Sequence, residues 1–319
     1  MLLLVFVRPF IDVYLPGNRV HETLQWLQAT EQHLAQRSAD RPRIIIVGGS
    51  NAVTGLQAAV LEAKLGLPAA NFGLMNEADD YRRTLALARH LARPGDTVVY
   101  SSRMLLGIDL DDLHSGWTLP VPTTQVGIWP TSRENIYAER SAIGIWFGPS
   151  APSDATFWTE AHLRDSRGDY LGCKPGSSLG SSVHAGASLP DQLLASHATL
   201  IDRLSAWHLG HLHEAAMAQL AQLSDELAKR RVKLLLRAPP IMTSSADLPR
   251  WHGYFAQMRS RYPFAASAWQ HPEQILINDG SLFCSQLHPT PQAARLFSEQ
   301  LAGQLQLMAS NKFTSHPQP

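Results

Sequence analysis

The sequence is poor in cysteine, carries no excess charge and lacks a long apolar run. Its two cysteines, Cys173 and Cys284, are too few for a disulfide framework and do not have the spacing of a zinc ribbon. Lysine plus arginine and aspartate plus glutamate both number 27, which gives a formal net charge of zero. Because nucleic-acid-binding proteins usually show a basic excess, we expect no nucleic-acid partner.

The N-terminal stretch MLLLVFVRPFIDVYLPG is apolar but short. Its run ends at Arg8, well before the ~20 residues that a membrane helix needs. It also lacks the basic start and the small-residue cleavage site of a signal peptide. Two interpretations stay open: the second half of a signal anchor, which would allow membrane association, or a buried N-terminal segment. We treat residues 1–40 as this segment and a following helix.

The remaining composition is that of a globular protein, with 45% hydrophobic and 17% charged residues in a chain of 319. The first hundred residues alternate between helical periodicity and short, continuous apolar runs. Helices are predicted at 19–37, 52–65 and 77–92, and strands at 43–48, within LPAANFG and at 97–101. This alternation predicts a parallel sheet in an α/β fold.

The alternation stops between residues 103 and 189, which are rich in Gly, Pro, Ser and Trp and predict an insertion. Its DSRGDYLG stretch is typical of a surface turn. Further elements are predicted beyond it: one long helix or two over 191–230, a strand at 232–240, a helix at 248–261, a fifth strand in EQILIND and a last helix from Thr290-Pro291. We predict a three-layer α/β/α, flavodoxin-like sandwich with a parallel sheet of about five strands over residues 41–310, followed by a tail at 311–319.

Ser50 lies where the first strand passes into the next helix, after Gly48 and Gly49. Ligands of doubly wound sheets bind outside the carboxyl ends of the strands. The turn could therefore cradle a phosphate, expose a nucleophile or simply redirect the chain. A phosphate-binding loop needs a lysine after its last glycine, and none follows Gly55. A serine nucleophile instead needs a histidine base and oxyanion donors.

Three short motifs follow one another in the order that such a site requires: VGGSNAVTGL, ANFGL and FCSQLHPTPQAARLF. They place a serine after the first strand, a glycine after the second and a histidine just before the last helix. They resemble the SGNH (GDSL-type) hydrolase superfamily over residues 43–102 and 270–305, and within it a bacterial envelope branch linked to O-acetylation of cell-surface polysaccharides. The resemblance implies that Ser50 is the nucleophile, that the N–H groups of Ser50 and Gly73 are oxyanion donors, and that His288 is the general base.

The chain departs from the superfamily at two places. The asparagine that usually follows the third strand is missing from VVYSSRM, so Asn76 or Ser102 would have to replace this oxyanion donor. The acid that precedes the histidine by three or four residues is replaced by Ser285 and Cys284. Asp279, nine residues upstream of that histidine, is the candidate acid. Without it the site would be a Ser–His dyad.

A metal site is not indicated. His208, His211 and His213 lie close together in the sequence, but on a helix only the first two share a face. No carboxylate pattern accompanies them, so we expect no metal, and we expect no organic cofactor. Cys284 invites a Cys–His nucleophile, but a buried structural cysteine is the better interpretation.

The resemblance implies a serine ester hydrolase or O-acyltransferase that acts on O-acetyl groups of a cell-surface or exported polysaccharide. Its partners would be a carbohydrate or acyl-ester substrate and proteins of envelope biosynthesis, and its location the cell envelope or periplasm. A second hypothesis is a catalytically degenerate SGNH fold that binds glycan or partner proteins in an export or assembly system. A third is a cytoplasmic esterase for small acyl esters, if the N-terminus is complete as it stands.

Overall fold

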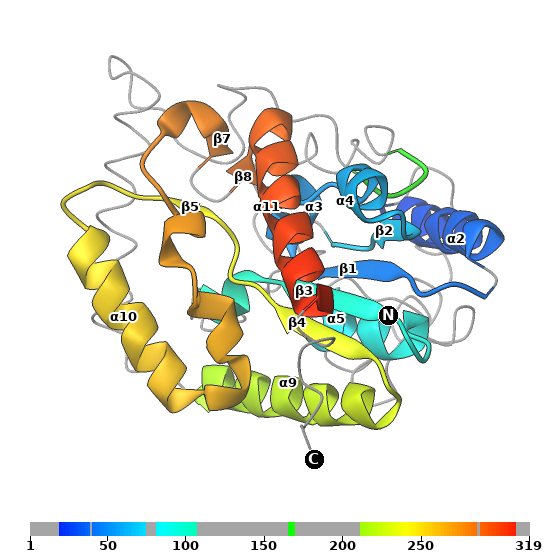
Figure 1. The fold of residues 1–319 in the computed structure, drawn as a ribbon, viewed down its shortest axis with the longest axis horizontal. Coiled ribbons are helices and arrows are strands. Elements are labelled where there is room, and N and C mark those ends of the chain that lie inside the picture. Colours follow the sequence, from blue (N-terminus) through cyan, green and yellow to red (C-terminus); the bar gives the residue numbers. More distant parts are fainter. Residues whose placement is uncertain are drawn as a thin grey trace, which may run out of the picture.

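The computed structural model describes residues 19–38, 40–74, 81–106, 165–169, 211–285 and 288–310. These residues form a mixed α/β structure around a parallel four-stranded sheet (Figure 1). The strand order is β2-β1-β3-β4. The four strands are β1 (Ile44–Gly48), β2 (Ala69–Asn71), β3 (Thr97–Ser101) and β4 (Lys233–Leu236). The predicted α/β class and parallel sheet are thereby confirmed.

Both faces of the central strand β1 are buried, which explains why β1 is continuously apolar. Ile45 and Val47 of β1 belong to a cluster with side chains of α2 (Arg19–Arg37), α5 (Tyr81–Leu91), α9 (His211–Lys229) and α10 (Leu248–Arg261). Ile44 and Ile46 belong to a second cluster with side chains of α4 (Ala58–Leu65) and α11 (Pro291–Ser310). Figure 1 shows α11 lying across this second face.

One predicted helix is divided into two helices in the structure. The sequence predicts a single helix at 52–65, but the structure has α3 (Ser50–Gly55) and α4, separated by Leu56 and Gln57 in extended conformation. The side-chain amide of Asn71 donates to the carbonyls of Ala52 and Leu56, each at 2.9 Å. These bonds fix the end of α3 beside β2, so the single-helix prediction is wrong because it ignores this tertiary contact.

The described part of DSRGDYLG, residues 165–169, forms the predicted turn, in which the N–H of Gly168 donates to the carbonyl of Asp165 at 2.9 Å, but Gly168 and Asp169 are buried. The carbonyl of Arg167 accepts from the N–H of Asn71 at 2.7 Å, which extends the edge of β2. Asp169 is only 2% exposed, and its carboxylate accepts from the N–H groups of Ala58 and Ala59 at 2.5 and 2.7 Å. It therefore caps α4, a role that serine, aspartate and asparagine fill at many helix starts.

The predicted fifth strand forms, but it does not pair with a strand of the four-stranded sheet. EQILIND contains β6 (Leu276–Ile277), which pairs in parallel with β5 (Ile241–Met242) in a separate two-stranded sheet. Membership of a five-stranded sheet therefore stays a prediction. The helices at 19–37, 248–261 and from Pro291 are confirmed by α2, α10 and α11.

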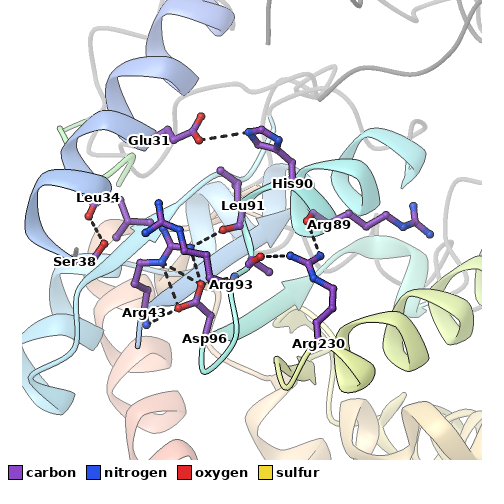
Figure 2. Close-up of polar contacts among 11 residues, drawn as sticks. Glu31, Leu34, Ser38, Arg43, Arg89, His90, Leu91, Arg93, Asp96 and Arg230 are labelled. Atoms are coloured by element: carbon purple, nitrogen blue, oxygen red, sulfur yellow. Dashed lines mark hydrogen bonds and ion pairs between the residues drawn. The ribbon is translucent and has the colours of Figure 1, made fainter. Parts of the chain in front are cut away.

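A buried ion pair joins the amino ends of β1 and β3. Figure 2 shows Arg43 and Asp96 pointing toward each other, with Arg43 Nη2 2.6 Å from Asp96 Oδ2. The same guanidinium donates to the carbonyl of Leu91, and Asp96 also accepts from the N–H of Arg93. Each buried charge thus has hydrogen bonds besides its partner, which a buried pair needs if it is not to destabilise the fold.

Several predictions concern residues that the structure does not describe. The N-terminal stretch 1–18, nearly all of the insertion 103–189 and the tail 311–319 lie outside the described residues. Among the helices that are described, none combines the length and the apolar character that crossing a bilayer requires.

Candidate active site

Ser50 and His288 meet at the carboxyl end of the sheet. Ser50 opens α3 directly after β1, and His288 opens β8 (His288–Pro289) directly before the last helix. The Oγ of Ser50 lies 3.0 Å from the Nε2 of His288, although the two residues are 238 positions apart in the sequence. The structure thus brings together the predicted nucleophile and the predicted base.

Gly48 shapes the turn that presents Ser50. Its φ of +146° is one that side-chain-bearing residues rarely adopt, and a Cβ at this position would lie 1.7 Å from the carbonyl oxygen of Ser101. Gly48 and Ser101 are register partners in the β1–β3 pairing. The chain can therefore leave β1 tightly against β3 only with glycine here, and α3 starts two residues later.

His288 is held by a hairpin and by the helix that follows it. β8 pairs antiparallel with β7 (Phe283–Ser285), with Ser285 opposite His288. Thr290 then caps α11, because its Oγ1 accepts from the N–H of Ala293 at 3.2 Å. A proline at the first helical position favours this start, since its missing N–H would have no helical partner. The strand pairing of His288 and the start of α11 thus fix the backbone at His288 and after it.

The imidazole of His288 is neutral at physiological pH. Burial lowers its pKa to about 3, and the positive charge of Arg103 acts in the same direction. A neutral ring can accept the Ser50 proton at Nε2 when its own proton is on Nδ1. The low pKa also makes His288 a weak base, so proton transfer needs a compensating charge in the transition state.

Gly73 is positioned by close packing. It follows β2, and a Cβ there would lie 2.8 Å from the backbone nitrogen of Val53 in α3. Its N–H donates to Oδ1 of Asn71 at 3.0 Å. Because Asn71 also binds the carbonyls of α3, it ties the predicted oxyanion donor to the helix that carries Ser50. The oxyanion role of Gly73 stays a prediction.

The remaining predicted site residues differ in their surroundings. Asp279 is exposed and begins the turn η6 (Gly280–Leu282), where its Oδ1 accepts from the N–H and Oγ of Ser281 at 2.9 and 2.6 Å. Ser102 is 4% exposed, and its Oγ accepts from the N–H of Met104 at 3.2 Å. Asn76 and the side chain of Cys284 lie outside the described residues. The catalytic role of Asp279 and the donor roles of Asn76 and Ser102 stay predictions.

Two residues near the site were not found from the sequence. Asn71 links β2, α3 and Gly73, and Arg103 carries the charge that acts on His288. The sequence signal for Asn71 was its position at the end of a strand, two residues before Gly73. Arg103 lies in the VVYSSRM segment, where the superfamily has its asparagine. Its positive charge in that segment was the signal that the sequence offered.

Within the described ranges, no group of three or more His, Cys, Asp or Glu side chains is placed to hold a metal ion. His213 instead makes structural contacts: its Nε2 lies 3.2 Å from the carbonyl of Met104 and its Nδ1 3.2 Å from the hydroxyl of Tyr262. Burial lowers the pKa of His213 to about 4. The side chains of His208 and His211 lie outside the described residues.

Comparison with known proteins gives no assignment. No protein-family model matches the chain, and no curated protein and no solved structure matches it either. The chemistry of the site is therefore inferred from its own geometry.

Proposed function

We propose that the protein is a serine ester hydrolase or O-acyltransferase of the SGNH type, with Ser50 as nucleophile and His288 as general base. The observation that carries this proposal is the 3.0 Å contact between Ser50 Oγ and His288 Nε2. A serine hydroxyl within hydrogen-bond reach of a neutral imidazole is the arrangement that nucleophilic serine catalysis needs. Its place at the carboxyl end of a parallel strand is where α/β proteins bind their ligands.

The chemistry proceeds in two steps. His288 Nε2 takes the Ser50 proton while Oγ forms a bond to the acyl carbon and the carbonyl electron pair moves to oxygen. The bond to the leaving alcohol then breaks, and His288 returns the proton to that alcohol. In the second step water or a sugar hydroxyl attacks the acyl-serine with His288 again as base, which releases the acid or the new ester and restores Ser50. The N–H groups of Ser50 and Gly73 are the proposed oxyanion donors.

We propose that the substrate carries a small acyl group on an accessible hydroxyl. Ser50 is only 3% exposed, so the carbonyl carbon of the ester must come close to a buried oxygen. An acetyl ester of a carbohydrate satisfies this requirement better than a long acyl chain. The polysaccharide substrate, the envelope location and any biosynthetic partners rest on the motif resemblance.

The fold that we propose for the whole domain is the flavodoxin-like, doubly wound sandwich. The strand order β2-β1-β3-β4 and the helix side chains buried on both faces of the sheet support it. In that architecture the order continues to a fifth strand beside β4.

The second candidate function is a catalytically degenerate relative that binds glycan or a partner protein. Two observations favour it. The pKa of His288 is lowered to about 3, which weakens the base, and Asp279 accepts hydrogen bonds within its own turn. A protein that retained the Ser–His pair without turnover would bind carbohydrate and would not release an acyl product.

Hydrolysis of p-nitrophenyl acetate separates the two candidates. The wild-type protein should release p-nitrophenol faster than the buffer does, and Ser50→Ala should abolish the excess rate. Ser245→Ala is the matched control, because Ser245 is exposed and its Oγ accepts from the side-chain amide of Asn278. The hydrolase proposal fails if wild type and Ser50→Ala have the same rate.

A further inference from the structure

Arg103 lies at the same edge of the sheet as Ser50. Gly48 of β1 is paired with Ser101 of β3, and each strand ends at that position. Ser50 and Arg103 each stand two residues beyond this pair. Since parallel neighbours end at the same edge, both side chains start from adjacent points at the carboxyl end of the sheet.

The short helix that carries Arg103, η1 (Arg103–Leu106), is fixed by side chains from three other elements. His213 of α9 contacts the carbonyl of Met104, and Trp269 donates from Nε1 to the carbonyl of Leu105 at 2.7 Å. Tyr254 of α10 donates from its hydroxyl to the carbonyl of Leu106 at 2.8 Å. Every carbonyl after Arg103 in η1 is therefore anchored.

The charge of Arg103 reaches the catalytic pair. After burial, the positive charge of Arg103 is the second cause that lowers the pKa of the His288 imidazole, and His288 in turn contacts Ser50. A cation beside a base disfavours the imidazolium that forms when the base takes a proton. The positive charge of Arg103 can assist the reaction only if a negative charge develops between Arg103 and His288 in the transition state.

An oxyanion is the negative charge that serine acyl transfer creates. The expected amide donor after the third strand is absent from the sequence, and Gly73, one of the two proposed backbone donors, shares its N–H with Oδ1 of Asn71. Arg103 is partly buried and stands two residues after the last residue of β3, within the segment that lacks this asparagine.

We propose that Arg103 stabilises the oxyanion formed on attack by Ser50, in the place of the missing asparagine. This inference rests on the proposed hydrolase function. As Oγ bonds to the acyl carbon, the carbonyl electron pair becomes an alkoxide between the guanidinium and the imidazolium. The alkoxide offsets the repulsion between these two cations, so His288 accepts its proton only as the tetrahedral species forms. When the carbonyl re-forms, the alcohol leaves with that proton.

The test is the rate at which a fluorophosphonate phosphonylates Ser50, because the attack develops negative charge on the phosphoryl oxygen. Arg103→Met should lower this rate by about 10²–10³-fold, the usual effect of losing one oxyanion donor. Arg103→Lys should recover part of the rate because it keeps the charge. Arg295→Met is the matched control: it removes the same charge from an exposed position on α11 and should leave the rate unchanged.

A second measurement, the pKa of His288, does not depend on turnover. It distinguishes an effect of the Arg103 charge from an effect of Arg103 packing. The pKa of His288, followed by NMR of labelled histidine, should rise in Arg103→Met, where burial alone still lowers it, and should not rise in Arg103→Lys. The inference is overturned if Arg103→Met leaves either the labelling rate or the His288 pKa at its wild-type value. If the wild-type protein is not phosphonylated, both the hydrolase proposal and the oxyanion role of Arg103 fail. If the wild-type protein and Arg103→Met are labelled at equal rates, only the role of Arg103 fails.

Discussion

His288 determines at the residue scale what the Ser50 hydroxyl can do. Its pKa is lowered to about 3, first by burial and second by Arg103, so the imidazole is already neutral at any pH well above that value. The acidic limb of kcat/KM reports the pKa of the base in the free enzyme. A histidine in its ordinary environment would place this limb near pH 6.5.

We therefore expect kcat/KM for p-nitrophenyl acetate to stay constant as the pH falls through 6.5 and to decline only near pH 4 or below. The measurement is a pH–rate profile of the wild-type protein, with circular dichroism at each pH to show that it remains folded. An acidic limb centred near 6.5 would contradict the environment described for His288.

Asp279 is the second residue whose role can be measured. Its carboxylate is exposed and accepts from the N–H and Oγ of Ser281, so it is engaged in capping its own turn. Loss of the orienting acid of a catalytic triad costs about 10⁴ in rate. We expect Asp279→Asn to lower kcat by less than about 10-fold, because asparagine keeps an oxygen that can cap the turn. A loss of 10³-fold or more would instead identify Asp279 as the acid.

The sequence predicted that Ser50 and His288 lie together, and the reason is geometric. Ser50 and His288 both lie directly at element boundaries, and boundary residues of an α/β fold gather at the carboxyl edge of the sheet. The surroundings of the pair could not be predicted in this way. The bond from Gly73 to Asn71 and the approach of Arg103 to His288 depend on side-chain directions that only the packed structure defines.

At the scale of elements, the turn between β1 and α3 is the most constrained part of the site. A Cβ at Gly48 would lie 1.7 Å from the Ser101 carbonyl oxygen, and the φ of +146° would add backbone strain. Gly253 offers the opposite case, since it lies inside α10 with no atom within 4 Å of an added Cβ.

We expect Gly48→Ala to lower the free energy of unfolding by more than about 3 kcal/mol, through overpacking and backbone strain. Gly253→Ala should raise it by about 0.5–1 kcal/mol, because alanine favours the helix. Urea unfolding of both variants beside wild type makes the comparison. Equal stabilities of the two variants would show that the turn at Gly48 is not as close to β3 as described.

Element boundaries show where sequence patterns stop being informative. The periodicity of residues 52–65 fits one helix, but Asn71 and Asp169 hold the chain in two. Both contacts come from residues that are distant in the sequence, so no local propensity could reveal the break. The helices α10 and α11 were predicted well because their apolar spacing and their prolines are local signals.

At the scale of the whole molecule, buried titratable groups make the stability depend on pH in opposite directions. His213 and His288 have lowered pKa values, so the unfolded chain binds protons more readily and stability falls as the pH drops below 6.5. Burial raises the pKa of Asp169 from 3.8 to about 7, while the bonds from Ala58 and Ala59 partly oppose the rise. The folded state then holds this proton better, so stability falls as the pH rises from about 4 to 7.

Asp169→Asn tests this balance. The variant should lose less free energy of unfolding than wild type between pH 5 and pH 8, since asparagine has no proton to release; each unit of raised pKa corresponds to about 1.4 kcal/mol. Urea midpoints at the two pH values provide the measurement. Asp225→Asn, at an exposed position on α9, is the control. An identical pH dependence in wild type and Asp169→Asn would refute the burial of this carboxyl group.

The most direct test of the central claim, that Ser50 and His288 form a working nucleophile and base, is the site of covalent labelling. Trypsin should release residues 44–64 as one peptide, in which Ser50 is the only serine. After treatment with a fluorophosphonate, mass spectrometry should find one phosphonyl group on this peptide in the wild-type protein and none in Ser50→Ala or His288→Ala. An unmodified peptide in the wild-type protein, or equal modification in His288→Ala, would contradict the account.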